Sequence, residues 1–293
     1  MDILNTVSQA ISEATGKTFN ADRNQHAGGG SINQAMKISD GHLSYFVKLN
    51  RPELLTMFEA EAAGLKELSR SDFVIPDVIC SGKNSRTAWL VLQSLQLGGG
   101  NQQSFAQAGE TFAHMHRIRN ERFGWSMNNT IGSTPQVNDW TAEWSDFWKT
   151  HRFGYQLKLA TENGYRRKVI DTASRLTDEC HQFFTHNPFP SLLHGDLWSG
   201  NLSFDEKAQP AIYDPAVYYG DREADLAMTE LFGGFSRSFY DAYNQSFPLQ
   251  PGYQVRKRLY NLYHVLNHMN LFGGGYEQQA LSMAESLLGE IRA

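Results

Sequence analysis

Apolar residues recur at two different spacings along the first third of the chain. They fall at helical intervals over residues 3–14 and again from Pro52 to about Leu68, which predicts two helices. Strand-like runs lie between and after them, and the dipeptide Asp40-Gly41 favours a hairpin turn between two of the runs. These runs cover residues 32–38, 43–49, 73–80 and 89–92, with a turn expected around residues 82–84. With a run before the glycine cluster at 28–30, they predict an N-terminal sheet of about five strands with one inserted helix.

The pattern changes after three consecutive glycines at residues 98–100, which cost too much conformational entropy to lie inside a helix or a strand. Helical spacing dominates beyond them, and one strand-like insertion covers residues 191–213. The expected helices span residues 102–119, 139–160, 165–186, 223–246 and 254–289. We therefore expect an α+β protein with a β-rich lobe over residues 1–95, a hinge, and a larger, mostly helical lobe over residues 96–293.

Composition narrows the class of protein. A chain of 293 residues that is 41% hydrophobic can bury a substantial core, which excludes a disordered protein. The net charge of −5 disfavours a nucleic-acid partner, because duplex-binding proteins normally carry a basic excess. No stretch approaches about 18 consecutive apolar residues, so we expect no membrane span and no membrane partner.

The N-terminus and the cysteines favour a cytoplasmic location. Residues 1–5 lack the basic region and apolar core of a signal peptide. The two cysteines, Cys80 and Cys180, are too few and too far apart for a zinc ribbon or a disulfide framework. We expect both to be free thiols in a reducing compartment.

Two carboxylates and an amide fall within one short span of the strand-like insertion. Asp196 and Asn201 belong to the segment HGDLWSGN at residues 194–201, and Asp214 follows the strand-like residues 211–213. A hairpin here would bring the three side chains to one end. Asn201 and Asp214 offer the hard oxygen ligands that Mg²⁺ prefers, and Asp196 can take a proton from an attacking hydroxyl. Each residue alone would be an ordinary turn former, but this spacing is typical of kinase-like phosphoryl transfer.

Other parts of a kinase site occur upstream in the expected order. A glycine-rich loop between two strands can present backbone N–H groups to phosphates. Lys48 lies in a strand-like run, where it would contact phosphate or, alternatively, extend from a sheet edge to solvent. Its acidic partner would be Glu59 or Glu61, and helical spacing favours Glu61. The run at 89–92 leads into a hinge whose backbone groups, Gln93 C=O and Leu95 N–H by position, can bind adenine.

With these residues in view, the chain resembles the kinase-like phosphotransferases that include aminoglycoside and choline kinases, and within them the fructosamine/ketosamine kinase family. The resemblance covers nearly the whole chain. It is carried by GGGSINQA (28–35), FVKLN (46–50), MFEAEAAGLKEL (57–68), LVLQSLQLGG (90–99), FGW (123–125), NNTIGSTPQVNDW (128–140), HGDLWSGN (194–201), DPAVYYGDREADLAM (214–228) and NHMNLFGGGY (267–276). The chain departs from related kinases in two ways. Its glycine loop lacks the cysteine that some members of the family carry, and His-Gly-Asp replaces the His-Arg-Asp of regulated protein kinases.

The resemblance implies a bilobal protein-kinase-like fold. It also implies ATP- and Mg²⁺-dependent phosphorylation of the third-carbon hydroxyl of a ketosamine, a free, peptide-bound or protein-bound sugar-amine adduct, leading to deglycation. Asp196 is then the catalytic base, Asn201 and Asp214 hold the metal, and Asp225 supports the catalytic loop. The nucleotide-binding residues are Gly28, Gly29, Gly30, Ser31, Ile32, Lys48, Glu61, Gln93, Ser94 and Leu95. For Trp198, substrate contact and core packing are open alternatives, and the resemblance favours His268 as a substrate contact.

Two alternatives use the same sequence features. The acceptor could be another hydroxyl compound of the aminoglycoside, choline or homoserine type, because the ATP-binding parts would be the same. A kinase-like scaffold without activity would be expected to have lost Lys48, Asp196, Asn201 or Asp214, and all four residues are present.

Overall fold

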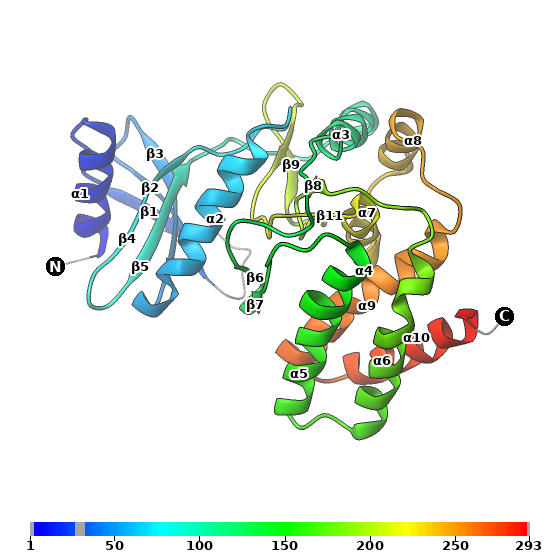
Figure 1. Cartoon of the computed structure of the whole chain (residues 1–293). Helices are drawn as coiled ribbons and strands as arrows, with labels where there is room; N and C mark the ends of the chain where they lie inside the picture. The colour runs from blue at the N-terminus through cyan, green and yellow to red at the C-terminus, as the bar shows by residue number, and fades with distance from the viewer. Residues whose placement is uncertain (1–2, 27–32, 292–293) are drawn as a thin grey trace.

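The computed structural model describes residues 3–26 and 33–291, and it has the two expected lobes (Figure 1). The N-terminal lobe contains α1 (Ile3–Thr15), α2 (Leu55–Leu68) and a five-stranded sheet. The strands are β1 (Arg23–His26), β2 (Gln34–Ser39), β3 (Ser44–Asn50), β4 (Val78–Lys83) and β5 (Ala88–Gln93). Their order is β1-β2-β3-β5-β4, and all neighbours are antiparallel, so the predicted sheet is confirmed.

The alternation of side chains along β3 and β5 explains why a helix covers each face of this sheet. Val47 and Val91 pack with residues of α1, whereas Leu90 and Leu92 pack with residues of α2. Successive residues of a strand point to opposite faces, so an almost continuous apolar strand serves two cores. Figure 1 shows α1 and α2 on the two sides of the sheet.

The fourth strand is shifted from its predicted position over residues 73–80. Val74 instead forms a parallel bridge with Ala211 of the other lobe, and Pro76 has no N–H with which to continue a ladder. The strand therefore begins at Val78, and its turn lies at residues 84–87, where the N–H of Asn84 donates to the C=O of Thr87. Phe73 is buried, but its ring packs against Phe112 of the second lobe and not within the sheet.

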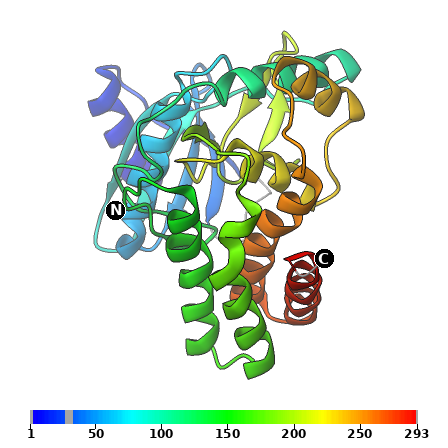
Figure 2. The same ribbon diagram turned by 45° about the vertical axis from the view of Figure 1, so that its right-hand side comes forward.

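The C-terminal lobe is mostly helical, as expected, and also contains short antiparallel strand pairs (Figures 1 and 2). Its helices are α3 (Gln102–Met115), α4 (Trp144–Phe147), α5 (Tyr155–Glu162), α6 (Arg167–Glu179), α7 (Arg222–Leu231), α8 (Arg237–Ser246), α9 (Tyr253–Phe272) and α10 (Tyr276–Ile291). Its strands pair as β6 (Asn129–Ile131) with β7 (Thr134–Gln136), β8 (Ser191–Leu193) with β11 (Tyr218–Gly220), and β9 (Leu202–Phe204) with β10 (Pro210–Ile212). Short 3₁₀ turns cover Pro52–Leu54 and Cys180–Phe183.

Three predicted helices are interrupted. The segment 223–246 divides at Gly233 and Gly234, and the segment 254–289 divides after Gly273, all three with positive φ. Residues that carry a Cβ rarely adopt a positive φ. These glycines therefore end helices although the apolar spacing continues past them. The segment 139–160 contains a seven-residue π-helix, Trp148–Gly154, between α4 and α5. Strands β6, β7 and β11 are not among the predicted elements; each has only three residues, and β11 pairs with β8, which is distant in the sequence.

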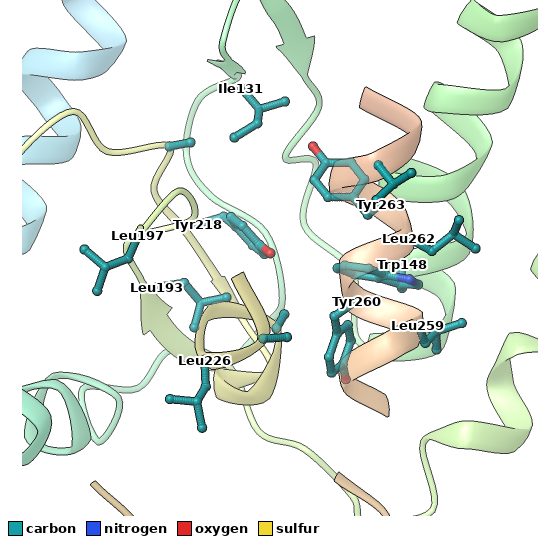
Figure 3. Packing of buried hydrophobic residues seen from close by; sticks show 14 of the residues in the cluster. Ile131, Trp148, Leu193, Leu197, Tyr218, Leu226, Leu259, Tyr260, Leu262 and Tyr263 are labelled. Carbon is teal, nitrogen blue, oxygen red and sulfur yellow. The ribbon is translucent and has the colours of Figure 1, made fainter. Parts of the chain in front are cut away.

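Aromatic side chains dominate the core of this lobe. Figure 3 shows Tyr260 and Tyr263 of α9 beside Trp148, with Tyr218 across the core. The Trp148 ring centroid lies 4.9 Å from that of Tyr260 and 5.6 Å from that of Tyr263. Buried aromatic rings contribute large apolar areas and edge-to-face contacts, which make this the stable platform beneath the site.

None of the helices in the described part of the chain combines the length and the apolar character that crossing a bilayer requires. Cys80 and Cys180 are both free, as expected. Burial raises the pKa of the Cys80 thiol to about 11 and that of the Cys180 thiol to about 12. Both thiols are therefore protonated and unreactive near neutral pH.

Candidate active site

A cavity of about 640 Å³ lies between the two lobes and brings together the chemistry-bearing residues of both. The predicted residues that line it are Lys48, Glu61, Gln93, Ser94, Leu95, Asp196, Trp198, Asn201, Asp214 and His268. The remaining predicted residues, Gly28, Gly29, Gly30, Ser31 and Ile32, lie outside the described residues. Asn33 and Ala35, which follow that glycine loop, line the cavity.

Lys48 connects the two lobes through an ion-pair triad. It lies on the central strand β3, opposite Ala35 and Leu90, and is only 5% exposed, so it is not an edge lysine. Its Nζ lies 2.5 Å from Glu61 Oε1 on α2 and 2.5 Å from Asp214 Oδ1 in the second lobe. Burial opposes the charge, but the two carboxylates raise the pKa of Lys48 above its ordinary value. The exposed Glu59 takes no part in this triad.

The hinge segment forms the wall of the cavity next to β5. Gln93 ends that strand, and its backbone N–H donates to the C=O of Asp77 over 2.8 Å. Ser94 and Leu95 follow and line the same wall. Beyond the hinge, Gly98 pairs with Phe204 of β9, and a Cβ at Gly100 would lie 2.1 Å from the Phe204 ring. Close contact with β9 thus explains at least one of the three consecutive glycines.

The loop that carries Asp196 is held in place by the buried Asp225 of α7. The backbone N–H groups of His194 and Gly195 donate to the two Asp225 carboxylate oxygens over 2.7 and 2.8 Å. Gly195 has a φ of +81°, and a Cβ there would lie 2.0 Å from the Ala216 carbonyl oxygen. Both observations require glycine. The supporting contact expected of Asp225 is therefore present, and the His-Gly-Asp departure has a steric cause.

His194 is a structural member of the same loop. The N–H of Asp196 donates to its Nδ1 over 3.2 Å, so Nε2 carries the proton and donates to the Tyr213 carbonyl over 3.0 Å. Burial lowers the pKa of His194, which keeps the ring neutral. This pair of bonds orients the backbone at Asp196 and ties it to the segment that leads to Asp214.

The β9–β10 hairpin brings Asn201 and Asp214 together, as the spacing predicts. These residues flank the hairpin, and the N–H of Tyr213 donates to the Asn201 carbonyl over 3.3 Å. The Asn201 amide nitrogen donates to the Asp196 carbonyl over 2.8 Å, and the amide oxygen is a hard donor of the kind that divalent cations prefer. Burial, and then the Asp214 and Asp225 carboxylates, raise the pKa of Asp196 well above its usual range.

The far end of the cavity contains residues that the sequence reasoning did not single out. They are Asn129, Thr130, Ile131 and Gly132 of the β6–β7 hairpin, with Met228, Phe232, Asn267, Leu271 and Phe272. Trp198 is 38% exposed, so it is a cavity residue and not part of the core. A Cβ at Gly200 would lie 2.4 Å from its ring, so the indole folds over that glycine. The segments 128–140 and 267–276 carried the resemblance and could have pointed to most of these residues.

The fold and the site define a kinase-like phosphotransferase. A lysine–glutamate pair in the sheet lobe faces a base-type aspartate and two metal-type ligands in the helical lobe, which is the division of labour in such enzymes. Solved structures of the aminoglycoside phosphotransferase APH(4)-Ia share this fold, with a TM-score of 0.65 at 13% identity over 97% of this chain and 98% of that chain.

Comparison with known proteins identifies the family. The sequence profile of the fructosamine kinase family matches residues 3–290, and the chain belongs to that family. It is 46% identical to a Synechocystis protein named as a probable ketoamine kinase, over 97% of this chain and 96% of that protein. It is 40% identical to the chloroplastic protein-ribulosamine 3-kinase of Arabidopsis thaliana, over 91% of this chain and 82% of that protein. A Haemophilus somnus structure assigned to a fructosamine-3-kinase has a TM-score of 0.89 at 30% identity, covering 98% of this chain and all of that one.

Proposed function

We propose that this protein phosphorylates the third-carbon hydroxyl of ketosamines, using ATP and Mg²⁺, and that the product ester leads to release of the amine. The observation that carries this proposal is the convergence of Lys48, Asp196, Asn201 and Asp214 on one cavity in a chain of this family. We expect it to act in the cytoplasm, because the two cysteines are free thiols and a reducing compartment keeps thiols reduced.

The sheet lobe supplies the groups for the nucleotide. Glu61 orients Lys48, whose ammonium group contacts the α- and β-phosphates. Backbone groups of Gln93 and Leu95 hold the adenine, and the loop containing Gly28, Gly29, Gly30, Ser31 and Ile32 covers the phosphates. The division of the chain into a nucleotide lobe (1–95) and a catalytic lobe (96–293) follows from this assignment.

The metal-type ligands fit a hard divalent cation. A carboxylate oxygen of Asp214 and the amide oxygen of Asn201 are oxygen donors, and both line the cavity beside Lys48. A bound Mg²⁺ offsets negative charge on the β- and γ-phosphate oxygens. With the metal bound, Asp214 would contact two cations, the Lys48 ammonium group and the metal ion.

Asp196 acts on the acceptor. It orients the third-carbon hydroxyl and takes its proton while the hydroxyl oxygen bonds to the γ-phosphorus. The bond from that phosphorus to the β–γ bridging oxygen breaks, and ADP leaves. Its raised pKa makes Asp196 a stronger base than an ordinary carboxylate. Trp198 and His268 contact the sugar-amine adduct from the far end of the cavity.

The test is ATP turnover with Mg²⁺ and fructosyl-lysine or ribulosyl-lysine, followed by phosphorus NMR of the product. We expect a phosphate ester on the third carbon. Asp196→Asn should lower kcat by at least about a thousandfold and leave ATP affinity nearly unchanged. Turnover only on an aminoglycoside or another hydroxyl compound would contradict the ketosamine assignment, and loss of ATP binding in the variant would contradict the role of Asp196.

A further inference from the structure

The acceptor end of the cavity is bordered by a chain of aromatic rings that the phosphoryl transfer does not use. We call Trp198, Phe232, His268 and Phe272 the aromatic rim. Ring centroids are 6.4 Å apart for Trp198 and Phe232, 5.0 Å for Phe232 and His268, and 5.5 Å for His268 and Phe272. The rings come from the catalytic loop, the end of α7 and the end of α9, so three separate elements converge there.

These rings remain open to solvent. The exposed fractions are 38% for Trp198, 39% for Phe232 and 57% for Phe272. They make up three of the six exposed large apolar side chains in the described part of the chain, the others being Leu43, Val78 and Leu97. Single exposed apolar residues are ordinary, but a contiguous group at the mouth of a cavity marks a ligand surface.

The charges around the cavity favour a cationic ligand at this end. Among its described lining residues Lys48 is the only lysine or arginine, and it is paired with two of the three acids, Glu61 and Asp214. Burial, and then His268, lower the pKa of His264 to about 3, so this ring is neutral and does not repel a cation. The described residues that line the cavity therefore include no unpaired lysine or arginine to oppose a positive charge at this end.

His268 presents a hydrogen-bond acceptor to the same space. Its Nδ1 lies 2.7 Å from the His264 carbonyl oxygen, which can only accept, so Nδ1 carries the proton. In the neutral ring Nε2 then has the free lone pair. An ammonium group at the rim would find aromatic faces for its charge and this nitrogen for one N–H.

We propose that the aromatic rim is the subsite for the protonated amine of the ketosamine, and that the amine's substituent leaves the cavity across Phe272. This inference rests on the proposed function. The amine is attached to the first carbon of the sugar, only two carbon–carbon bonds from the hydroxyl-bearing third carbon. A hydroxyl at Asp196 therefore holds the amine near Trp198, two residues further along the same loop. Because Phe272 is the most exposed ring, an adduct on a lysine side chain of a peptide can be accommodated.

The experiment compares two acceptors that differ only in charge. One is a 1-alkylamino-1-deoxyfructose, which is protonated at neutral pH, and the other is the matching 1-O-alkyl fructose ether, which is neutral. In the unaltered enzyme we expect the amine to have a KM about tenfold lower than the KM, or inhibition constant, of the ether. Phe232→Leu and Phe272→Leu keep an apolar side chain but remove the aromatic face. Each should raise the KM of the amine about fivefold and change the value for the ether less than twofold.

Phe189→Leu is the matched control, because Phe189 stacks on Arg119 and does not line the cavity. It should change neither value. Equal weakening of both acceptors by the rim variants, or equal affinity of the unaltered enzyme for both, would overturn the amine subsite while the proposed function stands. Failure to phosphorylate either compound would overturn the proposed function itself, and this inference with it.

Discussion

At Asp196, the base that we propose, the requirements of catalysis and of stability are opposite. Burial and two neighbouring carboxylates raise its pKa, so its ionised form is less favourable in the folded protein than in the unfolded chain. The backbone beside it is equally constrained, since Gly195 has a left-handed φ and no room for a Cβ. Asp225 offsets part of this cost by accepting two backbone N–H groups of the loop.

We therefore expect Asp196→Asn to raise the melting temperature while it removes turnover. The raised pKa means that the ionised carboxylate lowers stability at every pH above its folded-state pKa. This penalty shrinks as the pH falls through that pKa, and it is gone below the ordinary value of about 4, where the group is protonated in both states. At pH 8 the gain should be about 2 °C, and near pH 4 it should vanish. Thermal unfolding of both proteins across this range measures it.

Asp72→Asn is the control for this comparison, because Asp72 is exposed and does not line the cavity. It should leave the melting temperature unchanged at both pH values. A lower melting temperature for Asp196→Asn at pH 8 would mean that the carboxylate stabilises the loop.

The π-helix of residues 148–154 is the element that differs most from its prediction. Apolar spacing over residues 139–160 indicates one regular helix, but the structure widens it between α4 and α5. The wider turn carries Arg152, which is fully buried and donates to the Val137 carbonyl and the Asn138 side chain. Its guanidinium also lies 4.1 Å from the Tyr218 ring centroid. π-Helical turns recur at functional sites, and this one anchors the chain that follows the β6–β7 hairpin.

Removing this buried cation should destabilise the protein strongly. Arg152→Met keeps the length of the side chain but leaves the Val137 carbonyl and the Asn138 side-chain oxygen without their donor. We expect the free energy of unfolding to fall by about 3 kcal/mol, as measured by urea denaturation. Arg167→Met is the matched control, because Arg167 is exposed and, among the residues that the structure describes, forms its ion pair with Asp171 on the same helix. It should cost less than about 0.5 kcal/mol, and an equal cost for both variants would contradict the anchoring role.

Contacts outside the hinge hold the two lobes together across the whole molecule. The Tyr219 hydroxyl on β11 donates to Glu67 over 2.6 Å and accepts from Arg70 over 2.6 Å, both from the end of α2 or just after it. Val74 of the first lobe exchanges two backbone hydrogen bonds with the β10 strand. The hydrogen bonds of Tyr219 thus hold α2, the helix that carries Glu61, against the second lobe.

Loosening this link should weaken nucleotide binding as well as the fold. We expect Tyr219→Phe to lower the melting temperature by about 3 °C and to raise the KM for ATP about threefold, because α2 then holds Glu61 less firmly. The KM for the ketosamine should change little. Tyr155→Phe is the control, since the described residues offer the Tyr155 hydroxyl no hydrogen-bond partner. A lower melting temperature without any change in the KM for ATP would show that the interlobe contact does not influence the nucleotide site.

Local sequence was sufficient for much of this protein. The sheet lobe, the helical lobe and the meeting of Asn201 with Asp214 followed from apolar spacing, turn residues and short-range motifs, whereas the structure decided that Lys48 lies on a central strand and not at a sheet edge. Such features are decided within about ten residues, by side-chain alternation and backbone preference. Family resemblance then supplied the kind of reaction, which no periodicity contains.

Tertiary structure decided what depends on residues distant in the chain. Phe73 packs against Phe112 and Val74 bridges to Ala211, both in the second lobe, instead of extending a strand of the sheet. The π-helix forms where Arg152 donates to Val137 and Asn138. The aromatic rim draws its rings from positions 198, 232, 268 and 272, whose proximity no local pattern encodes. Burial itself is a property of the assembled fold, so the raised pKa of Asp196 and the neutral ring of His264 exist only after the lobes and helices have packed.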